Sequence, residues 1–510
     1  MKAILSSGTF SVALTSDIWT GKSMMDFMSV VVHNIDEQWN LNKRIIAFRR
    51  IEGKHTANNI LEIILGVIQE WELSARIISV TLDNATSNDS MIRGLQTKIL
   101  CEENLMHQRC ATHIINLIVQ SGARAFHSGI KRIRHAISWI NSSTPRVDEL
   151  KRRFLLHGLH ERTFHVDNKI RWNSTYLMLT NFLSEGYYEV IVAFYNSSLS
   201  EGEGALSEED INMAKVFVTF LKLFYDQTCC LSAVYKPTSH LAIHSLCAIA
   251  QHFKTNMDYV NFQDCISSMR DKFLKYWGKG KIPYLYGYAC ILDPRIQLDG
   301  FKMFLNFLQD MFIGEDYITH DHNRIVEGFY DLFRVYQERV APPPEPSPPR
   351  NARQEEEYMF LSVHRHFRGV DGSPQSSPRG RGGRGSPQPS RPIYDEISRY
   401  TTHLHVEYSN TKLDLLDWWR QHEGMLPILA SMARDILTIP VSTVSSESAF
   451  SSSGRIIDDR RCSLSPEMVE ALTVGKDWIL HSRRAQETFR EIEIIDDFDT
   501  RFSNINLTHP

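Results

Sequence analysis

Near its start the chain reads SVALTSDIW (residues 11–19), MSVVVHNID (28–36) and RIIAFRRIEG (44–53), and these three stretches decide the fold. Each is rich in β-branched residues and is bounded by polar or glycine turns, as in successive antiparallel strands. The next stretch, HTANNILEIILGVIQEWEL (55–73), has its apolar residues at helical spacing, and ARIISVTLDNA (75–85) is again a short apolar run. The sequence therefore predicts the order β-β-β-α-β.

This order begins a ribonuclease-H-like sheet, in which a crossover helix returns the chain to a fourth strand beside the first. From about residue 91 to 340 the pattern is predominantly helical, with amphipathic stretches such as DINMAKVFVTFLKLFYDQTCCL (210–231). We therefore expect the α/β (α+β) class: a ribonuclease-H-like mixed sheet, interrupted by a large α-helical insertion and followed by a helical C-terminal segment.

The composition changes sharply at residues 341–392, where proline, arginine, glycine and serine replace most apolar residues. Such a segment buries too little apolar surface to offset the entropy of ordering, so we expect a disordered linker with at most a short helix near 355–367. We therefore divide the chain into five segments: the first part of the core (1–135), a mostly α-helical insertion (136–340), the linker (341–392), a helical C-terminal region that completes the core (393–485) and a tail (486–510).

The bulk composition excludes several classes of protein. The formal net charge of −4 means that any affinity for nucleic acid must come from local patches. The eight cysteines lack the paired spacings of a disulfide framework or a zinc site, so we expect a reducing compartment and no zinc. No run of about 18 apolar residues and no signal-peptide pattern is present, so we expect a soluble, intracellular protein without a membrane partner.

Three acidic residues are candidates for a shared site. Asp17 and Asp83 lie at the ends of the first and fourth expected strands, which are neighbours in the sheet, so their carboxylates would converge. Glu447 follows the helix-capping residues of PVSTVSSESAF (440–450) and would lie in the first turn of a helix packed on that sheet. Three carboxylates could hold two Mg²⁺ or Mn²⁺ ions for an in-line phosphoryl transfer. From position alone, each acid is more commonly a turn or cap residue.

Several separated motifs resemble the hAT transposase family. They are LTSDIWT (14–20), TLDNATSND (81–89), RCATHIINLIVQSG (109–122), IRWNSTYLML (170–179), KFLKYW (272–277), ILDPR (291–295) and the long run from Asp414 to Ile479. The chain is most similar to plant members of the Ricesleeper and Daysleeper type, over nearly its whole length apart from the linker. The length and order of these motifs make the resemblance highly specific.

The resemblance implies a catalytic triad. The family's catalytic acids are the Asp of a DxW motif, the Asp of a DN motif and the Glu before an AFS segment, and these fall on Asp17, Asp83 and Glu447. Family members use such acids, with Mg²⁺ or Mn²⁺, to cut DNA beside the element, to form a hairpin on the flanking end and to join the free 3′-OH to target DNA. DNA is therefore the expected partner.

Two further pairs of residues match family motifs. Arg171 and Trp172 match an arginine followed by an aromatic residue that stacks on distorted DNA, and such stacking is worth about 1–3 kcal/mol per base. A tryptophan in a helical region is, however, more commonly a core residue. Cys110 and His113 match the family's CxxH motif; two ligands do not make a structural zinc site, so we expect a packing or supporting role near the acids.

The last motif resembles the family's dimerisation segment. It contains an apolar set larger than a short segment can bury by itself: Trp418, Trp419, Leu426, Ile428, Leu429, Phe450 and Trp478. These residues could pack on the chain's own core or contact a second chain. The resemblance implies a homodimer, or a heterodimer with related hAT proteins.

A full-length family member begins with a BED zinc finger that docks on DNA, and no such finger precedes the first expected strand. We therefore expect a domesticated or truncated, DNA-associated nuclear protein that dimerises through its C-terminal region. Two alternatives remain. One is an active cut-and-paste transposase core with an Asp-Asp-Glu triad, and the other is a non-catalytic remnant that pairs with full-length relatives.

Overall fold

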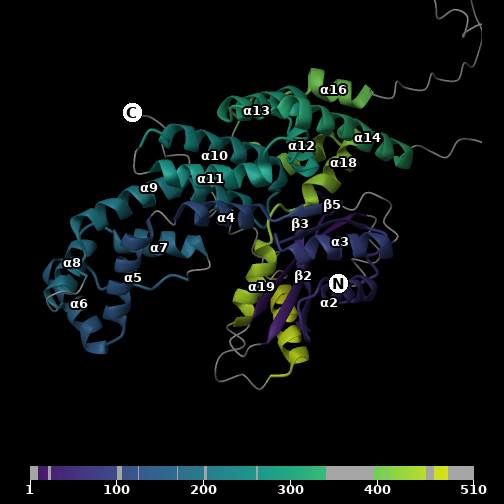
Figure 1. The fold of residues 1–510 in the computed structure, drawn as a ribbon. Helices are drawn as coiled ribbons and strands as arrows, with labels where there is room; N and C mark the ends of the chain where they lie inside the picture. The colour runs from purple at the N-terminus through teal and green to yellow at the C-terminus, as the bar shows by residue number, and fades with distance from the viewer. Residues whose placement is uncertain are drawn as a thin grey trace, which may run out of the picture.

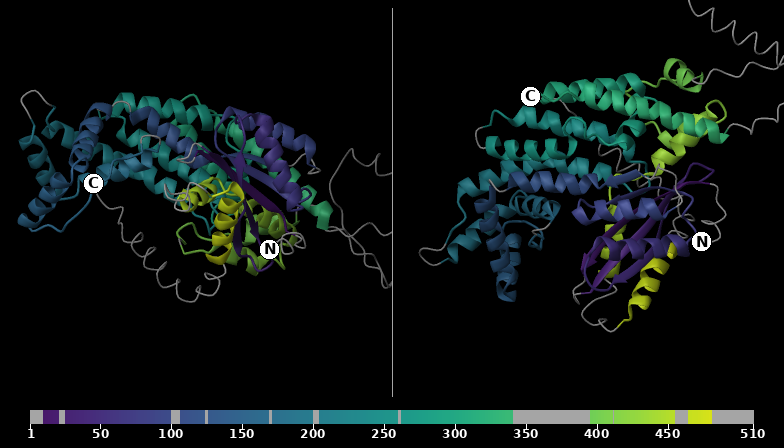
Figure 2. Two further views of the ribbon diagram at one scale, coloured as in Figure 1. Left: turned by 90° about the horizontal axis from the view of Figure 1, so that it is seen from below. Right: turned by 45° about the vertical axis from the view of Figure 1, so that its right-hand side comes forward.

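The computed structural model describes residues 10–20, 25–99, 106–123, 126–168, 171–199, 204–259, 262–340, 395–410, 412–454 and 464–480. A mixed sheet with helices against it occupies one side of the molecule, and a long array of helices occupies the other (Figure 1). Figure 2 shows the same two parts from below and from the side. This architecture is the predicted α/β class with a large helical insertion.

Within the described ranges the sheet has five strands in the order β3-β2-β1-β4-β5. Their bounds are β1 (Val12–Thr20), β2 (Asp26–Ile35), β3 (Leu41–Ile51), β4 (Ile77–Leu82) and β5 (Met106–Arg109). The first three strands pair antiparallel, β4 pairs parallel to β1, and β5 pairs parallel to β4. The β-β-β-α-β opening is therefore as predicted. The pattern does not predict β5, because four residues, MHQR, are too few and too polar to show alternation.

The two faces of the sheet follow from the alternation of side chains along each strand. On one face, Val12, Leu14 and Val30 join a core with α2 (Ala57–Glu70) and α3 (Thr86–Lys98). Helix α2 begins at Thr56, whose hydroxyl accepts a hydrogen bond from the backbone N–H of Asn59. On the other face, a second core holds the alternate residues of the same strands, and the C-terminal part of the chain covers it.

The helical part runs from the end of the sheet to residue 340. Its bounds are α4 (Ala111–Ala123), α5 (His127–Asn141), α6 (Thr144–Leu156), α7 (Trp172–Phe182), α8 (Tyr187–Ser197), α9 (Glu208–Leu231), η2 (Ser239–Leu241), α10 (Ala242–Asn256), α11 (Gln263–Trp277), α12 (Tyr284–Ile291), α13 (Gln297–Met311), η4 (Ile318–His322) and α14 (Asn323–Val340). The expected boundary between residues 135 and 136 falls inside α5.

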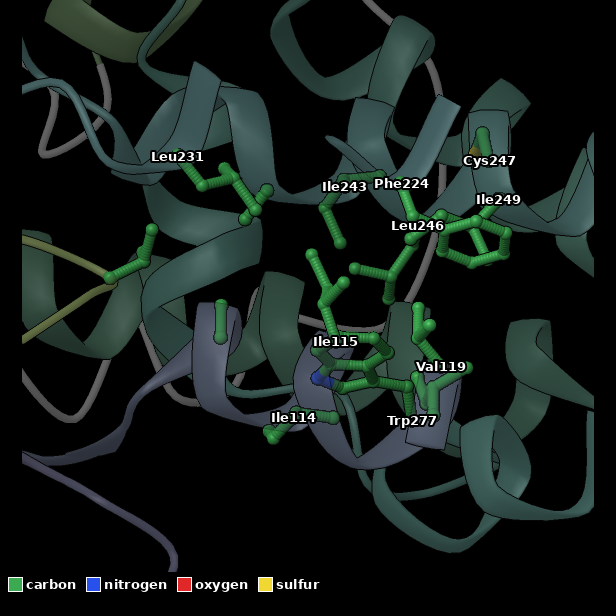
Figure 3. Close-up of a cluster of buried hydrophobic side chains, with 14 of the residues drawn as sticks. Ile114, Ile115, Val119, Phe224, Leu231, Ile243, Leu246, Cys247, Ile249 and Trp277 are labelled. Atoms are coloured by element: carbon green, nitrogen blue, oxygen red, sulfur yellow. The ribbon is translucent and has the colours of Figure 1, made fainter. Parts of the chain in front are cut away.

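Helix α4 joins the two parts, because it begins directly after β5 and is buried among later helices. Figure 3 shows this core, in which side chains of α4, α9, α10 and α11 meet: Ile114, Ile115, Val119, Phe224, Ile243, Leu246 and Trp277. An apolar core of this kind makes the insertion continuous with the sheet rather than a loosely tethered domain.

The C-terminal part returns to the sheet through α16 (Asp395–His403), α17 (Leu415–His422), α18 (Pro427–Thr438), α19 (Val444–Gly454) and a last helix at 466–480. Helix α18 ends before Pro440, as the sequence predicts. Its Asp435 is buried and accepts hydrogen bonds from the Ser11 hydroxyl (2.8 Å) and the Tyr336 hydroxyl (2.6 Å). One carboxyl therefore ties together the start of β1, α14 and α18.

The expected linker (341–392), the short helix near 355–367 and the tail (486–510) lie outside the described residues. Cys101 and Cys462 lie outside them as well, and the six cysteines that the structure does describe are free thiols. In the described ranges, no helix combines the length and the apolar character needed to cross a membrane.

His33 on β2 supplies a prediction about acid stability. Burial lowers the pKa of its imidazole to about 3, and the neighbouring charge of Lys43 acts in the same direction. Between about pH 6.5 and pH 3 the unfolded chain binds a proton here that the folded chain does not, so folding stability falls as the pH falls. From pH 7 to pH 5 this one group should remove about 2 kcal/mol, since each pH unit below its unfolded pKa counts for about 1.4 kcal/mol.

The measurement is urea unfolding of wild type and His33→Gln at both pH values. The variant should lose less stability on acidification than wild type does, by about 2 kcal/mol. An equal loss in the two proteins would mean that His33 does not stay neutral in the folded state.

Candidate active site

The backbone register brings Asp17 and Asp83 to the same level of the sheet. Strands β1 and β4 are parallel neighbours, with Thr15 opposite Thr81. Two residues further along each chain are Asp17, still within β1, and Asp83, directly after β4. Asp17 therefore lies before the end of its strand, rather than at the end as the sequence suggests, and it is the parallel register that aligns the two acids.

Glu447 lies in the first turn of α19, as expected from the capping residues before it. A buried set of hydroxyl groups seats this helix on the sheet. The Ser446 hydroxyl donates to the Thr15 hydroxyl (2.9 Å), and the Ser29 hydroxyl donates to the backbone carbonyl of Ser446 (3.2 Å). Thr15 also contacts Nε2 of His33 at 3.2 Å. These contacts fix the residue next to Glu447 against β1 and β2.

The loop before α19 is held by Cys110. The Cys110 thiol accepts hydrogen bonds from the backbone N–H and the hydroxyl of Thr443, both at 3.3 Å. The backbone N–H of Cys110 donates to the carbonyl of Leu82 (2.8 Å), the residue before Asp83. Burial raises the pKa of this thiol, so it remains protonated and unreactive. Cys110 therefore links the loop that leads to Glu447 with the end of β4.

His113, the other half of the CxxH motif, lies in the first turn of α4 and is partly buried. Its backbone N–H points to the Cys110 thiol and helps to lower the pKa of that group against the effect of burial. Thr81 on β4 makes a further contact with this loop, because its hydroxyl donates to the carbonyl of Pro440 at 2.9 Å. The loop before α19 is thus fastened at several points to β4 and α4.

Asp83 has a structural role as well. Its Oδ1 atom accepts from the backbone N–H of Ala85 (3.1 Å) and from the amide of Asn88 (2.5 Å), so it caps the turn into α3. This is the ordinary use of an Asp after a strand. The same contacts fix the direction of the carboxylate.

The charges of the other two carboxyl groups act on Asp17. The pKa of Asp17 is raised to about 7, first by burial and next by the charge of Glu447, and Asp83 adds to the rise. The backbone N–H of Ile18, 2.9 Å from Oδ1 of Asp17, and the charge of Arg171 act in the opposite direction. A divalent cation brought near these oxygen donors would favour the charged form of Asp17.

Arg171 comes to this cluster from the helical insertion. Its guanidinium group lies 3.1 Å from the Glu447 carboxylate, and 57% of its side chain is exposed. Glu447 is therefore paired with an arginine in this arrangement. Among the described residues, no group of three or more His, Cys, Asp or Glu side chains is arranged closely enough to hold a metal ion.

Trp172 does not face the acids. It is the first residue of α7, only 5% of it is exposed, and it packs in the large core beside Tyr176 with ring centroids 6.2 Å apart. Trp172, Tyr176 and Leu179 occupy the buried face of α7 at helical spacing. This is the core position that the sequence alone favours. Stacking on a DNA base would require the ring to leave that core.

The apolar residues expected at the dimer contact lie in the core of their own chain. Trp419 is fully buried and donates its indole N–H to the carbonyl of Leu292 (3.0 Å). Trp478 donates to the carbonyl of Ile45 (3.0 Å). The others are buried or partly buried in the same way: Trp418, Leu426, Ile428, Leu429 and Phe450. In this arrangement they pack mainly between the helices and the sheet, and their direct contact with a second chain stays a prediction.

Sequence reasoning missed the residues that seat α19. Thr15, Ser29 and Ser446 are 0% exposed although their side chains are polar. A signal was present, because Thr15 and Ser29 are polar residues at positions that alternation assigns to the inside of the sheet. A buried hydroxyl needs a hydrogen-bond partner, and here the partners come from a helix remote in sequence.

Four family descriptions match successive parts of the chain. They are the ZBED1 RNase-like domain (15–110), the ZBED1 RNase-like helical domain (108–220), the hAT-like transposase RNase-H fold (240–336) and the hAT family C-terminal dimerisation region (396–479). Their order along the chain follows the order of the sheet, the helical part and the returning C-terminal helices. The dimerisation region covers α16 to α19 and most of the last helix.

Three relatives illustrate the similarity. The chain is 29% identical to "Putative AC transposase" of Zea mays, over 94% of this chain and 59% of that protein. It is 27% identical to RICESLEEPER 2 of Oryza sativa subsp. japonica, over 92% of this chain and 65% of that protein, and 24% identical to DAYSLEEPER of Arabidopsis thaliana, over 92% and 64%. The chain thus spans about three-fifths of the length of these relatives.

A pair of serine substitutions in α19 tests how this helix is seated. Ser446→Ala removes a buried hydroxyl that donates to Thr15 and should lower the free energy of unfolding by about 1 kcal/mol. Ser448→Ala is the matched control, since its exposed hydroxyl bonds only within the helix to Val444 and its loss should cost less than about 0.5 kcal/mol. Urea unfolding followed by circular dichroism measures both. Equal effects would contradict a seating role for Ser446.

Proposed function

We propose that this hAT transposase-like chain, with its C-terminal dimerisation region, is a domesticated, DNA-associated nuclear protein that retains a phosphoryl-transfer site at Asp17, Asp83 and Glu447. One observation carries the assignment of the site. The carboxyl group of Asp17 on β1 is influenced by the charges of Asp83, directly after β4, and of Glu447 on α19, although Glu447 is remote in sequence from the other two. A purely structural acid needs no such neighbours.

Each residue of the proposed site has a separate role. The turn contacts of Asp83 fix the direction of its carboxylate, the contacts of Ser446 position Glu447 at the start of α19, and Asp17 is influenced by the charges of both acids. Mg²⁺ or Mn²⁺ bound by these oxygens would activate the attacking oxygen and stabilise the leaving oxygen of a strand cleavage. Cys110 and His113 act on this site only indirectly, by holding the loop before α19.

Arg171 is assigned to DNA. Its exposed guanidinium borders the carboxylates, and an arginine can bind a phosphate oxygen as readily as a carboxylate. When DNA occupies the site, Arg171 would exchange Glu447 for a backbone phosphate. This exchange would bring the phosphate close to the acids. Such phosphate contacts fix the position of a protein on DNA and do not recognise the base sequence.

A second candidate is a non-catalytic protein that binds DNA or pairs with related hAT proteins. The ion pair between Arg171 and Glu447 favours it, because an arginine that stays on Glu447 keeps one of the three carboxylates occupied. We rank it second, because the Arg171 side chain is exposed. An exposed ion pair contributes only about 0–1 kcal/mol of stability, so Arg171 can leave Glu447 readily. The partners are the same under both proposals: DNA, a second copy of the chain, and related hAT chains.

Cleavage of labelled duplex DNA with Mg²⁺ or Mn²⁺ separates the two candidates. Wild type should produce nicks or hairpins, and Asp83→Asn and Glu447→Gln should each lower the rate at least about 100-fold, because each removes a charge that acts on the metal. Glu62→Gln, an exposed acid on α2 paired with Lys98, is the control and should retain full activity. Cleavage that persists in both site variants would exclude this site. DNA binding without any cleavage by wild type would favour the second candidate.

The role of Arg171 is tested by the salt dependence of DNA binding. Loss of one phosphate contact should reduce the slope of log K against log salt by about 0.9, so Arg171→Ala should weaken binding most at low salt. Arg334→Ala is the control, because Arg334 on α14 is similarly exposed and also pairs with an acid, Asp331. Identical slopes for Arg171→Ala and wild type would remove Arg171 from the interface.

A further inference from the structure

The last helix, residues 466–480, covers the open edge of the sheet (yellow in Figure 2). Strand β3 is an edge strand, and an edge strand has backbone groups without a partner strand. The helix supplies partners from its side chains. Glu470 accepts from the backbone N–H of Phe48 (3.1 Å), and Asp477 accepts from the backbone N–H of Ile45 (3.0 Å). These two acids are seven residues apart and therefore share one face of the helix.

Further contacts hold the helix in this position. Lys43 Nζ lies 3.1 Å from the Asp477 carboxylate, and both side chains are largely buried. Val469 and Thr473 are each 1% exposed on the same side. These contacts fix the orientation of the helix on β3, so the same opposite face is always turned to solvent.

That opposite face is apolar. Met468 is 48% exposed, Leu472 is 42% exposed and Ile479 is 57% exposed. Together with Gly475 they follow a 4-3-4 spacing, which is the seam pattern of a packed pair of helices. We call Met468, Leu472, Gly475 and Ile479 the seam. A β-carbon added to Gly475 would meet no atom within 4 Å, so none of the residues that the structure describes fills the middle of the seam.

We propose that the seam is the surface through which a second copy of this chain binds. The inference rests on the dimerisation included in the proposed function and assigns residues to it. The seam lies within the region matched by the hAT family C-terminal dimerisation description (396–479). Elsewhere in the described part of that region, Tyr408 and Met425 are the exposed large apolar residues, and they lie on separate segments. The seam is where exposed apolar side chains recur along one helix face.

The chemistry of the seam suits a copy of itself. In a two-fold symmetric dimer the same patch serves both partners, and a straight apolar stripe on a helix can pack against the identical stripe. Gly475 lets the two backbones approach closely because it carries no side chain. The large tryptophans and leucines of the region remain in the core, so the dimer forms without rearranging either chain.

The test is sedimentation of the full chain over about a hundredfold range of concentration. Wild type should form a dimer, and the double variant Met468→Lys with Leu472→Lys should weaken the dimer at least about 100-fold, because two charges would be buried in the contact. Leu155→Lys with Leu156→Lys is the matched control: these leucines on α6 are 57% and 70% exposed but lie outside the dimerisation region. The control should dimerise like wild type.

A second variant controls for the possibility that the double lysine variant loses the dimer because its last helix unfolds. Gly475→Glu replaces a poor helix former with a good one at a position without neighbours, so the helix should stay intact while the seam gains a charge. It too should be monomeric. If both seam variants dimerise like wild type, the seam is overturned while dimerisation itself stands. If wild type is monomeric at every concentration, the dimer in the proposed function fails together with its seam.

Discussion

Helix α19 reaches the sheet only after the chain has passed through the whole helical insertion, and a few buried hydroxyl groups hold it there. Thr15, Ser29 and Ser446 are buried polar groups whose hydrogen bonds are made with one another. An unpaired hydroxyl in such a place would cost about 1–3 kcal/mol, so the sheet and the helix each need the other. The position of Glu447, and with it the candidate site, depends on this contact.

The helical insertion allows the contact between α19 and the sheet to form, because it returns the chain close to the point where the chain leaves the sheet. A flexible loop of such length would add to the entropy cost of closure. Instead, α4 leaves β5 directly and is buried among α9, α10 and α11, while α18 joins β1 and α14 through Asp435. Arg171 on the same insertion reaches Glu447. The insertion is thus both a rigid spacer and a source of side chains for the site.

The C-terminal region shows how one sequence stretch can serve two purposes. Its tryptophans fill the space between the helices and the sheet, and its last helix closes the edge of β3 with Glu470 and Asp477. Closing an edge in this way prevents unwanted strand pairing. The apolar face that remains, from Met468 to Ile479, is left for a partner chain.

The sequence by itself determined the order of the first four strands, the helical insertion and the return of the chain, because these depend on local alternation and on long motifs. It also identified Asp17, Asp83 and Glu447 as candidates, and in the tertiary structure the charges of Asp83 and Glu447 act on Asp17. Only the tertiary structure decided that Trp419 is a core residue, that Arg171 pairs with Glu447, and that the seam is exposed. The sequence does not distinguish an apolar residue of the core from an apolar residue of an exposed surface, because burial depends on which distant segments pack against it.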